Sequence, residues 1–310
     1  DVAISLVKAT FESGFVKNKV LEFAGPGVKN LPIDFRNGID IMTTETTCLS
    51  SIWVTDEEVK HHYELHNRPQ DYKELRPGKT AYYDAMIRID LGTQESMIAL
   101  PFHPSNACTI HELQEHPEEI LKKIEEDGRK RYGDKVKDVN LMSKIRDGKV
   151  WADQGIIAGC SGGTYDNLCE AAAILNGQSI GNDYFTMSAY PQSSPVSLAT
   201  QRSGVAQTLT EAGVVLKPAF CGPCFGAGDV PGNDCLSIRH TTRNFPNREG
   251  SKPGQGQISW VALMDARSIA ATAANGGRIT AATDVEYEDN YAPYKYDGRS
   301  YEHCVNNGFG

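Results

Sequence analysis

Three cysteines in glycine-rich turns are the residues whose types and spacing most clearly allow chemistry. Cys160 lies in Gly-Ile-Ile-Ala-Gly-Cys-Ser-Gly-Gly-Thr, and Cys221 and Cys224 form a Cys-Gly-Pro-Cys motif. A C-x-x-C pair allows two thiolates to reach one metal centre from a single turn, and a distant third cysteine completes one face. Three thiolates hold three corners of a [4Fe–4S] cube and leave the fourth iron without a protein sulfur. Such an iron can bind a substrate oxygen as a Lewis acid.

Two other interpretations of these cysteines stay open from the residues alone. A Cys-Gly-Pro-Cys pair is also the pattern of dithiol redox proteins, in which a helix begins at the first cysteine. Dithiol chemistry at Cys221 and Cys224 is the weaker hypothesis, because the following Phe-Gly-Ala-Gly-Asp is a poor helix start. A zinc-stabilised binding module is the other alternative, but structural zinc generally takes four ligands, and no fourth Cys or His has paired spacing.

Two arginines and a glutamate are the remaining candidates. Arg243 and Arg248 lie on either side of a Phe-Pro-Asn turn and could present two guanidinium groups to a substrate that carries carboxylates. Surface salt bridging explains the arginines at least as well. Glu45 stands among threonines and could accept a proton or orient a metal-bound water. The sequence around Glu45 alone favours an ordinary surface glutamate.

Composition limits the class of protein. The chain of 310 residues is long enough for two domains, and its net charge of −9 argues against a nucleic-acid partner. Its apolar runs fall short of the roughly 20 residues of a membrane span. Eight cysteines are too few for a disulfide scaffold in a chain of this length, so we expect a reducing, cytoplasmic compartment. Because the sequence begins with Asp1 and has no initiator methionine, we expect it to be a fragment or a processed form of a longer protein.

Alternating strand and helix patterns predict the elements that position these residues. The sequence pattern changes near residue 93. Before it we expect helices over 1–12 and 55–66 and strands over 20–23 and 86–91. Thr55 and Glu58 would form a capping box for the second helix. A charged surface helix follows over 117–132. Beyond it we expect strands over 155–158, 184–189, 214–220 and 258–264, and helices over 164–175, 197–212 and 268–274.

This alternation is typical of right-handed βαβ units. It predicts an α/β fold with mostly parallel sheets, covered on both faces in three α/β/α layers. Ligands of such sheets bind at the carboxyl ends of the strands, and Cys160 and Cys221 follow two predicted strand ends. We expect two domains, over residues 1–93 and 94–280, and a polar connecting segment over 281–310.

The order of the motifs resembles the aconitase superfamily of iron–sulfur hydro-lyases. The interval from Cys160 to Cys221, followed by C-x-x-C, is close to the family's. Residues 158–163 are similar to its Gly-Ser-Cys-Thr-Asn-Ser, and residues 242–248 to its Asn-Arg-Asn-Phe-x-Gly-Arg. Residues 20–28, the segment that holds Glu45, and Leu-Pro-Phe-His-Pro at 100–104 also resemble family segments, so the likeness covers nearly the whole chain.

The resemblance implies reversible removal and addition of water on a hydroxy di- or tricarboxylate. Cys160, Cys221 and Cys224 would ligate a [4Fe–4S] cluster, Arg243 and Arg248 would bind substrate carboxylates, and Glu45 would lie near the iron-bound oxygen. The likeness covers only the family's second and third domains and the start of the linker to its swivelling fourth. The first domain and the fourth, with its catalytic serine, would be missing partners, so we expect these residues alone to be inactive. Without those domains one wall of the cluster site would be open to solvent and oxygen, which can damage or remove the cluster.

Three departures from the family pattern concern side-chain amides. Thr242 stands where the family has an asparagine before the first arginine, Ile41 where aconitases have an asparagine, and Gly162 where the family has an asparagine after the first cysteine. Each change removes a polar contact with cluster or substrate. A divergent hydratase acting on a hydroxy acid other than citrate is therefore at least as compatible with the sequence as an aconitase.

Overall fold

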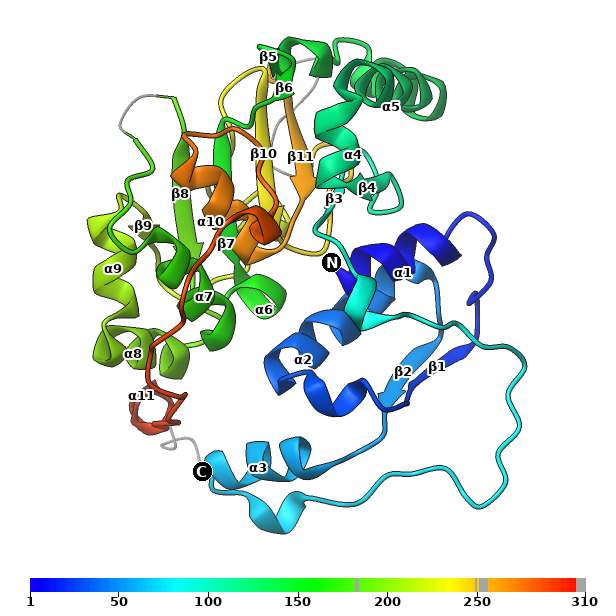
Figure 1. The fold of residues 1–310 in the computed structure, drawn as a ribbon, viewed down its shortest axis with the longest axis vertical. Coiled ribbons are helices and arrows are strands. Elements are labelled where there is room, and N and C mark those ends of the chain that lie inside the picture. Colours follow the sequence, from blue (N-terminus) through cyan, green and yellow to red (C-terminus); the bar gives the residue numbers. More distant parts are fainter. Residues whose placement is uncertain (182–183, 249, 251–255, 305–310) are drawn as a thin grey trace.

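A seven-stranded sheet lies at the centre of the computed structural model, which describes residues 1–181, 184–248, 250 and 256–304 (Figure 1). Its strand order is β4-β3-β11-β10-β7-β8-β9. The strands are β3 (Met97–Ala99), β4 (Ala107–Thr109), β7 (Gln154–Ala158), β8 (Thr186–Tyr190), β9 (Val215–Leu216), β10 (Cys235–His240) and β11 (Ser259–Leu263). The last five of these run parallel to one another, and β3 and β4 are antiparallel. The prediction of an α/β fold with a mostly parallel sheet is confirmed.

Helices α7 (Tyr165–Leu175) and α10 (Ala266–Ala274) pack against each other and against the middle of this sheet. Successive side chains of a strand point to opposite faces. Ile157 and Ile238 therefore join the main core with these helices, whereas the neighbouring Arg239 faces the other side, where a loop covers it. This second face carries the polar contacts that bear on the candidate site.

The N-terminal part packs beside the sheet (Figure 1). It consists of α1 (Val2–Thr10), α2 (Ile33–Met42), α3 (Glu57–Leu65) and the parallel pair β1 (Val20–Phe23) and β2 (Ser50–Trp53). Val7 and Ile39 share one apolar cluster with Met97 and Leu263 of the large sheet, so α1 and α2 pack against β3 and β11. The division into units 1–93, 94–280 and 281–310 stays a prediction.

The remaining elements complete the outline. They are α4 (Ile110–Glu115), α5 (Pro117–Tyr132), the antiparallel pair β5 (Ile145–Arg146) and β6 (Lys149–Val150), α6 (Gly159–Gly162), α8 (Ser194–Ser203), α9 (Val205–Glu211) and α11 (Arg299–Cys304). Helix α5 has the predicted bounds, with Leu121 and Ile124 buried. No helix among the described residues has both the length and the apolar character needed to cross a membrane.

Three local predictions were wrong. Residues 86–91 form no strand: they belong to an irregular segment along the outside, where Met86 is 84% exposed (Figure 1). The cap of α3 is Asp56 instead of Thr55, because Asp56 Oδ1 accepts the N–H of Val59 while its carboxylate pairs with Arg36. The helix expected over 197–212 is two helices, since Gly204 adopts φ +85° between them.

Two strands also differ from expectation. The strand expected over 214–220 is reduced to Val215–Leu216 at the sheet edge. Strand β10 was not predicted, although Leu236 and Ile238 alternate with Ser237 and Arg239 as a strand should. β10 occupies the middle of the sheet and carries the arginine loop on its carboxyl end.

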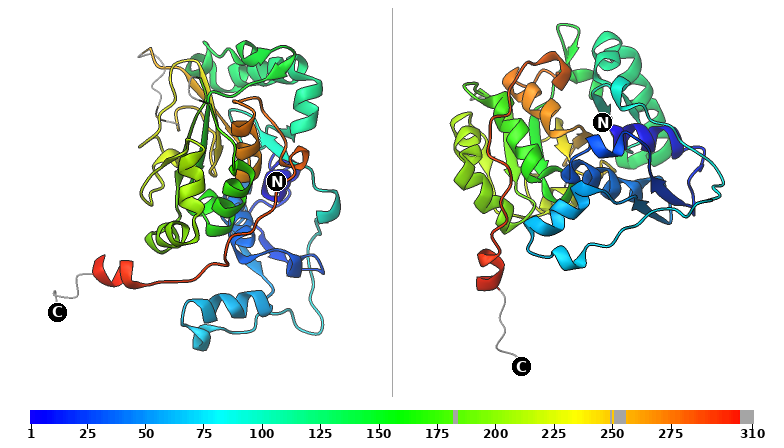
Figure 2. Two further views of the ribbon diagram at one scale, coloured as in Figure 1. Left: turned by 60° about the vertical axis from the view of Figure 1, so that its left-hand side comes forward. Right: turned by 60° about the horizontal axis from the view of Figure 1, so that its bottom comes forward.

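The segment after residue 281 first packs against helices α7 and α9 and then extends away from them. Tyr165 Oη donates to the carbonyl of Ala292 at 2.7 Å, and Tyr291 Oη bonds Thr208 Oγ1 at 2.7 Å. Helix α11 then projects outward (Figure 2). Residues 305–310 of the predicted linker lie outside the described residues.

Candidate functional site

The candidate residues gather where the order of the parallel strands reverses. From β7 the chain continues to β8 and β9 on one side of the sheet, and then returns to β10 and β11 on the other. The carboxyl ends of neighbouring β7 and β10 thus flank a topological switch point, the usual ligand position in α/β sheets. Cys160 follows β7 within α6, and Arg243 follows β10.

Cys160 and Cys221 meet across a glycine. Gly159 adopts φ +65°, and a Cβ at this position would lie 2.5 Å from Cys221 Sγ. Glycine therefore allows both the left-handed turn and the close approach of the second cysteine. The Cys160 thiol lies within hydrogen-bonding reach of Cys221, and burial together with the neighbouring Cys221 and Cys224 raises the pKa of Cys160 to about 11.

Cys224 connects the cysteine turn to the arginine loop. The backbone N–H of Thr242 donates to the Cys224 sulfur, and the positive charges of Arg243 and Arg239 act on the same thiol. Burial outweighs these effects and raises the pKa of Cys224. Gly226 and Gly250 bring the two loops into contact, since a Cβ on Gly226 would lie 2.6 Å from the backbone of Gly250.

The three cysteines fit the donor set of a cluster. All three are free and half-buried, and they interact with one another at the edge of the sheet. Within the described part of the chain, no three His, Cys, Asp or Glu side chains are placed to hold a single metal ion. A cluster makes a different demand, because each thiolate binds its own iron. Cys221 precedes a short 3₁₀ turn, Gly222–Cys224, in place of the longer helix expected of a dithiol redox motif.

Glu45 and Arg243 form a direct ion pair, with Arg243 Nε donating to Glu45 Oε1 at 2.8 Å. Glu45 is only 8% exposed, so the interpretation as an ordinary surface glutamate is wrong. Asn244 fixes the arginine loop, because its Nδ2 donates to the carbonyls of Ala99 and Leu100. The ion pair of Glu45 and Arg243 thus joins the N-terminal part of the chain to the loop after β10.

Arg248 lies farther along the same loop. Asn247 precedes it in the left-handed region at φ +68°, and the N–H of Arg248 donates to the carbonyl of Phe245 at 3.2 Å. Its Nε is buried, and the described residues provide no hydrogen-bond partner for it. A buried guanidinium N–H in this position is available to an anionic ligand.

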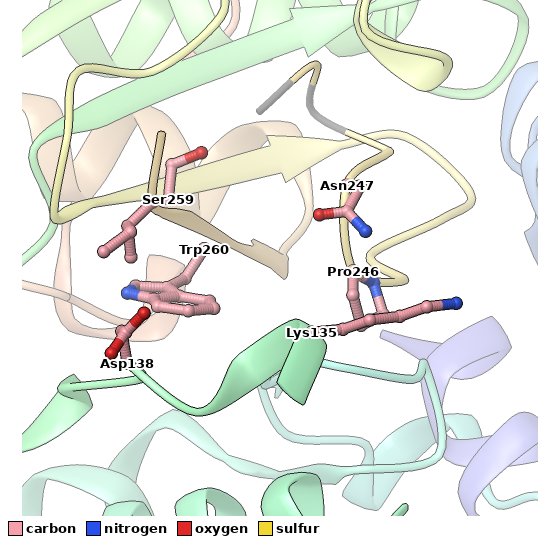
Figure 3. A pocket seen from close by; sticks show the side chains of 7 residues that line it. Lys135, Asp138, Pro246, Asn247, Ser259 and Trp260 are labelled. Atoms are coloured by element: carbon pink, nitrogen blue, oxygen red, sulfur yellow. The ribbon is translucent and has the colours of Figure 1, made fainter. Parts of the chain in front are cut away.

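A small cavity borders the same loop on the side of Pro246 and Asn247, with Lys135, Asp138 and Trp260 around it (Figure 3). Its volume of about 10 Å³ is enough for one water molecule and far too small for a substrate. None of the six candidate residues lines this cavity. This cavity is therefore separate from the candidate site formed by the cysteine and arginine loops.

Gly162 explains one departure from the family pattern. A Cβ at this position would lie 2.3 Å from the carbonyl oxygen of His240 and 2.8 Å from its side chain. An asparagine there would need a shift of backbone, so the close contact between α6 and the end of β10 requires glycine.

Comparisons with known proteins agree with the motif order. A model of the aconitase family (aconitate hydratase) matches residues 1–271. The chain is 28% identical to mitochondrial homoaconitase of Candida parapsilosis, over 92% of this chain and 38% of that protein. It is 29% identical to the 3-isopropylmalate dehydratase large subunit of Campylobacter fetus (81% and 52%), and 27% identical to the 2,3-dimethylmalate dehydratase large subunit of Eubacterium barkeri (84% and 52%).

The chain thus spans about half or less of the length of these relatives. The family model nevertheless covers most of the chain, including the three cysteines and both arginines. On this match, the chain belongs to the aconitase family.

Proposed function

We propose that this chain forms the cluster-binding part of a hydro-lyase that adds water to, and removes it from, a hydroxy di- or tricarboxylate. The observation that carries this proposal is the meeting of Cys160, Cys221 and Cys224 beside the pair formed by Arg243 and Glu45. The names of the relatives, which include homoaconitase and two malate-type dehydratases, support the substrate class.

Cys160, Cys221 and Cys224 would hold the cluster. When bound, it supplies a Lewis-acidic iron that polarises a substrate oxygen. We expect this chemistry in a reducing compartment, such as the cytoplasm, where thiols stay available.

Two arginines would bind the substrate carboxylates. Arg248 has a buried Nε without a partner among the described residues, and a carboxylate oxygen would satisfy it. Arg243 uses its Nε for Glu45, so its terminal nitrogens remain the donors for a ligand. Glu45 would orient Arg243 and lie close to the reacting oxygen.

The test of the ligand set is anaerobic reconstitution with iron and sulfide, read by visible absorption and iron content. We expect about four irons per chain in the unaltered protein. Cys160→Ala, Cys221→Ala and Cys224→Ala should each abolish cluster binding, whereas the matched control Cys235→Ala should keep it. A full cluster in any of the first three variants would contradict the assignment.

The same experiment separates the two alternatives. A zinc module would bind zinc without visible absorbance, and a dithiol protein would cycle Cys221 and Cys224 without iron while Cys160 remains dispensable. Because the family resemblance assigns proton abstraction to a serine in another domain, we also propose that these 310 residues alone do not turn over substrate. Formation of an unsaturated acid from citrate or isopropylmalate by the reconstituted chain would refute that proposal.

A further inference from the structure

Arg239 is a fully buried cation at the centre of the sheet, only 1% exposed. It lies on β10, and its guanidinium group points to the face beneath the cysteine loop. Nη1 donates to the carbonyl of Pro223 at 2.7 Å, and Nη2 donates to the carbonyl of Asp229 at 2.9 Å. Nε donates to Ser237 Oγ at 2.9 Å, and that hydroxyl is in turn bonded to Gln154 of the neighbouring strand.

These contacts join two points of one loop to the sheet. Pro223 lies between Cys221 and Cys224, and Asp229 lies five residues beyond Cys224. Asp229 adopts a left-handed φ of +48°, and its carboxylate accepts a hydrogen bond of 2.7 Å from Tyr190 at the end of β8. The guanidinium group of Arg239 thus binds both the cysteine turn at Pro223 and the later part of the loop at Asp229. Tyr190 gives Asp229 a second attachment.

The chemistry of arginine suits this task. Its planar fork presents several N–H donors in fixed directions, whereas a lysine ammonium is a point charge on a flexible stem. Burying a cation in a sheet costs free energy that an apolar side chain would avoid. Arg239 is also close enough to Cys224 to interact with it electrostatically, so its positive charge lies where thiolates would gather.

We propose that Arg239 is a positioning residue that holds Cys221 and Cys224 in the geometry needed to bind a cluster. The purpose of this positioning rests on the proposed function. The hold of Arg239 on the turn consists of hydrogen bonds within the chain, so it can be tested in protein prepared without iron.

The experiment compares Arg239→Gln and Arg239→Lys with Ser237→Ala, which removes one partner of Arg239 but neither contact with the loop. In the metal-free protein, we expect the amides of residues 222–229 to exchange hydrogen about tenfold faster in both Arg239 variants, with β7 and β11 unchanged. Phenylarsine oxide, which bridges two neighbouring thiols, should capture Cys221 and Cys224 several-fold more slowly. Ser237→Ala should resemble the unaltered protein in both measurements.

Unchanged exchange in the loop, or unchanged capture by phenylarsine oxide, would overturn the proposal. The proposal would also be overturned if Arg239→Lys increased hydrogen exchange in the strands of the sheet as much as in residues 222–229. Arg239 would then stabilise the whole sheet instead of positioning the loop. If Arg239→Gln fails to fold, Arg239→Lys decides, because it keeps the charge but places all its donors on one nitrogen.

Reconstitution tests the proposed function separately. If the unaltered chain binds a cluster, both Arg239 variants should bind less iron, and their visible spectrum should differ from that of the unaltered protein. A full cluster with an unchanged spectrum would refute the positioning role. Failure of the unaltered chain to bind iron would count against the cluster function, whereas the metal-free measurements would still decide whether Arg239 holds the turn.

Discussion

Glu45 and Arg243 lie 198 residues apart in the chain and meet at 2.8 Å. Glu45 belongs to the segment after α2, and Arg243 to the loop after β10, so their ion pair joins two parts that the sequence separates by a long interval. The Glu45 carboxylate is buried, whereas the Arg243 side chain is 42% exposed. Glu45 therefore fixes Nε of Arg243 and leaves its terminal nitrogens accessible.

The first prediction concerns this pair. Glu45→Gln keeps the shape of the side chain but removes its charge, so the hydrogen bond from Arg243 is no longer part of an ion pair. We expect the free energy of unfolding to fall by about 1 kcal/mol, a value kept small because solvent screens the half-exposed Arg243. Urea denaturation measures the change. Glu286→Gln, on the exposed C-terminal segment, is the control and should leave stability unaltered.

The second prediction concerns Gly162. Because the carbonyl of His240 leaves no room for a Cβ, Gly162→Ala should lower the free energy of unfolding by about 1–3 kcal/mol. Gly78→Ala is the control, since a Cβ there makes only ordinary contact, 3.8 Å from the carbonyl of Thr80. Thermal unfolding of both variants compares them directly. Equal stability of Gly162→Ala and the unaltered protein would show that α6 can move away from β10.

Part of this arrangement could be predicted from the sequence. The strands that continue apolar runs, such as β7 and β11, and the amphipathic helix α5 follow from local periodicity. The cysteine and arginine candidates follow from their motifs. The rule that ligand residues gather at the carboxyl ends of parallel strands predicts that Cys160 and Cys221 lie close together. It does not place the arginines beside them, because β10, the strand that the arginine loop follows, is not predicted.

Other features depend on contacts between distant segments. The burial of Glu45 could not be predicted from its threonine-rich surroundings, because its ion-pair partner Arg243 lies 198 residues away in the sequence. The sequence around Arg239 does not distinguish it from an ordinary solvent-facing arginine. The available signal was alternation: Leu236 and Ile238 fill one face, so Ser237 and Arg239 had to share the other. The loop carbonyls of Pro223 and Asp229, which accept hydrogen bonds from Arg239, are contacts that its neighbours in the sequence do not indicate.

The third prediction concerns acid stability and Asp166. Burial, followed by the nearby carboxylates of Asp34 and Glu170, raises the pKa of Asp166 to about 7. A carboxyl group whose pKa is higher in the folded than in the unfolded chain binds more protons when folded, so it destabilises the fold increasingly as pH rises from about 4 to 7. Asp166→Asn should therefore raise the free energy of unfolding at pH 8 relative to the unaltered protein, and the gain should disappear near pH 4. A gain independent of pH would contradict this cause.

The fourth prediction concerns His103, whose pKa has the opposite effect. Burial, and then the positive charge of Arg131, lowers the pKa of His103 to about 4. Its Nδ1 accepts the N–H of Ser105 at 3.0 Å, and its ring packs on Phe11 and Phe245, so the folded chain holds the neutral imidazole.

Because His103 binds its proton less readily when folded, its contribution to stability is complete above pH 6.5 and falls as pH decreases toward 4. From pH 7.5 to pH 5 we expect a loss of about 2 kcal/mol from this residue. In His103→Asn, whose Oδ1 can replace the Nδ1 acceptor, the pH-dependent loss should be smaller by that amount. His61→Asn is the control, because His61 is exposed on α3. Urea denaturation at both pH values measures the difference, and the same pH dependence in His103→Asn and the unaltered chain would mean that His103 takes up its proton without loss of structure.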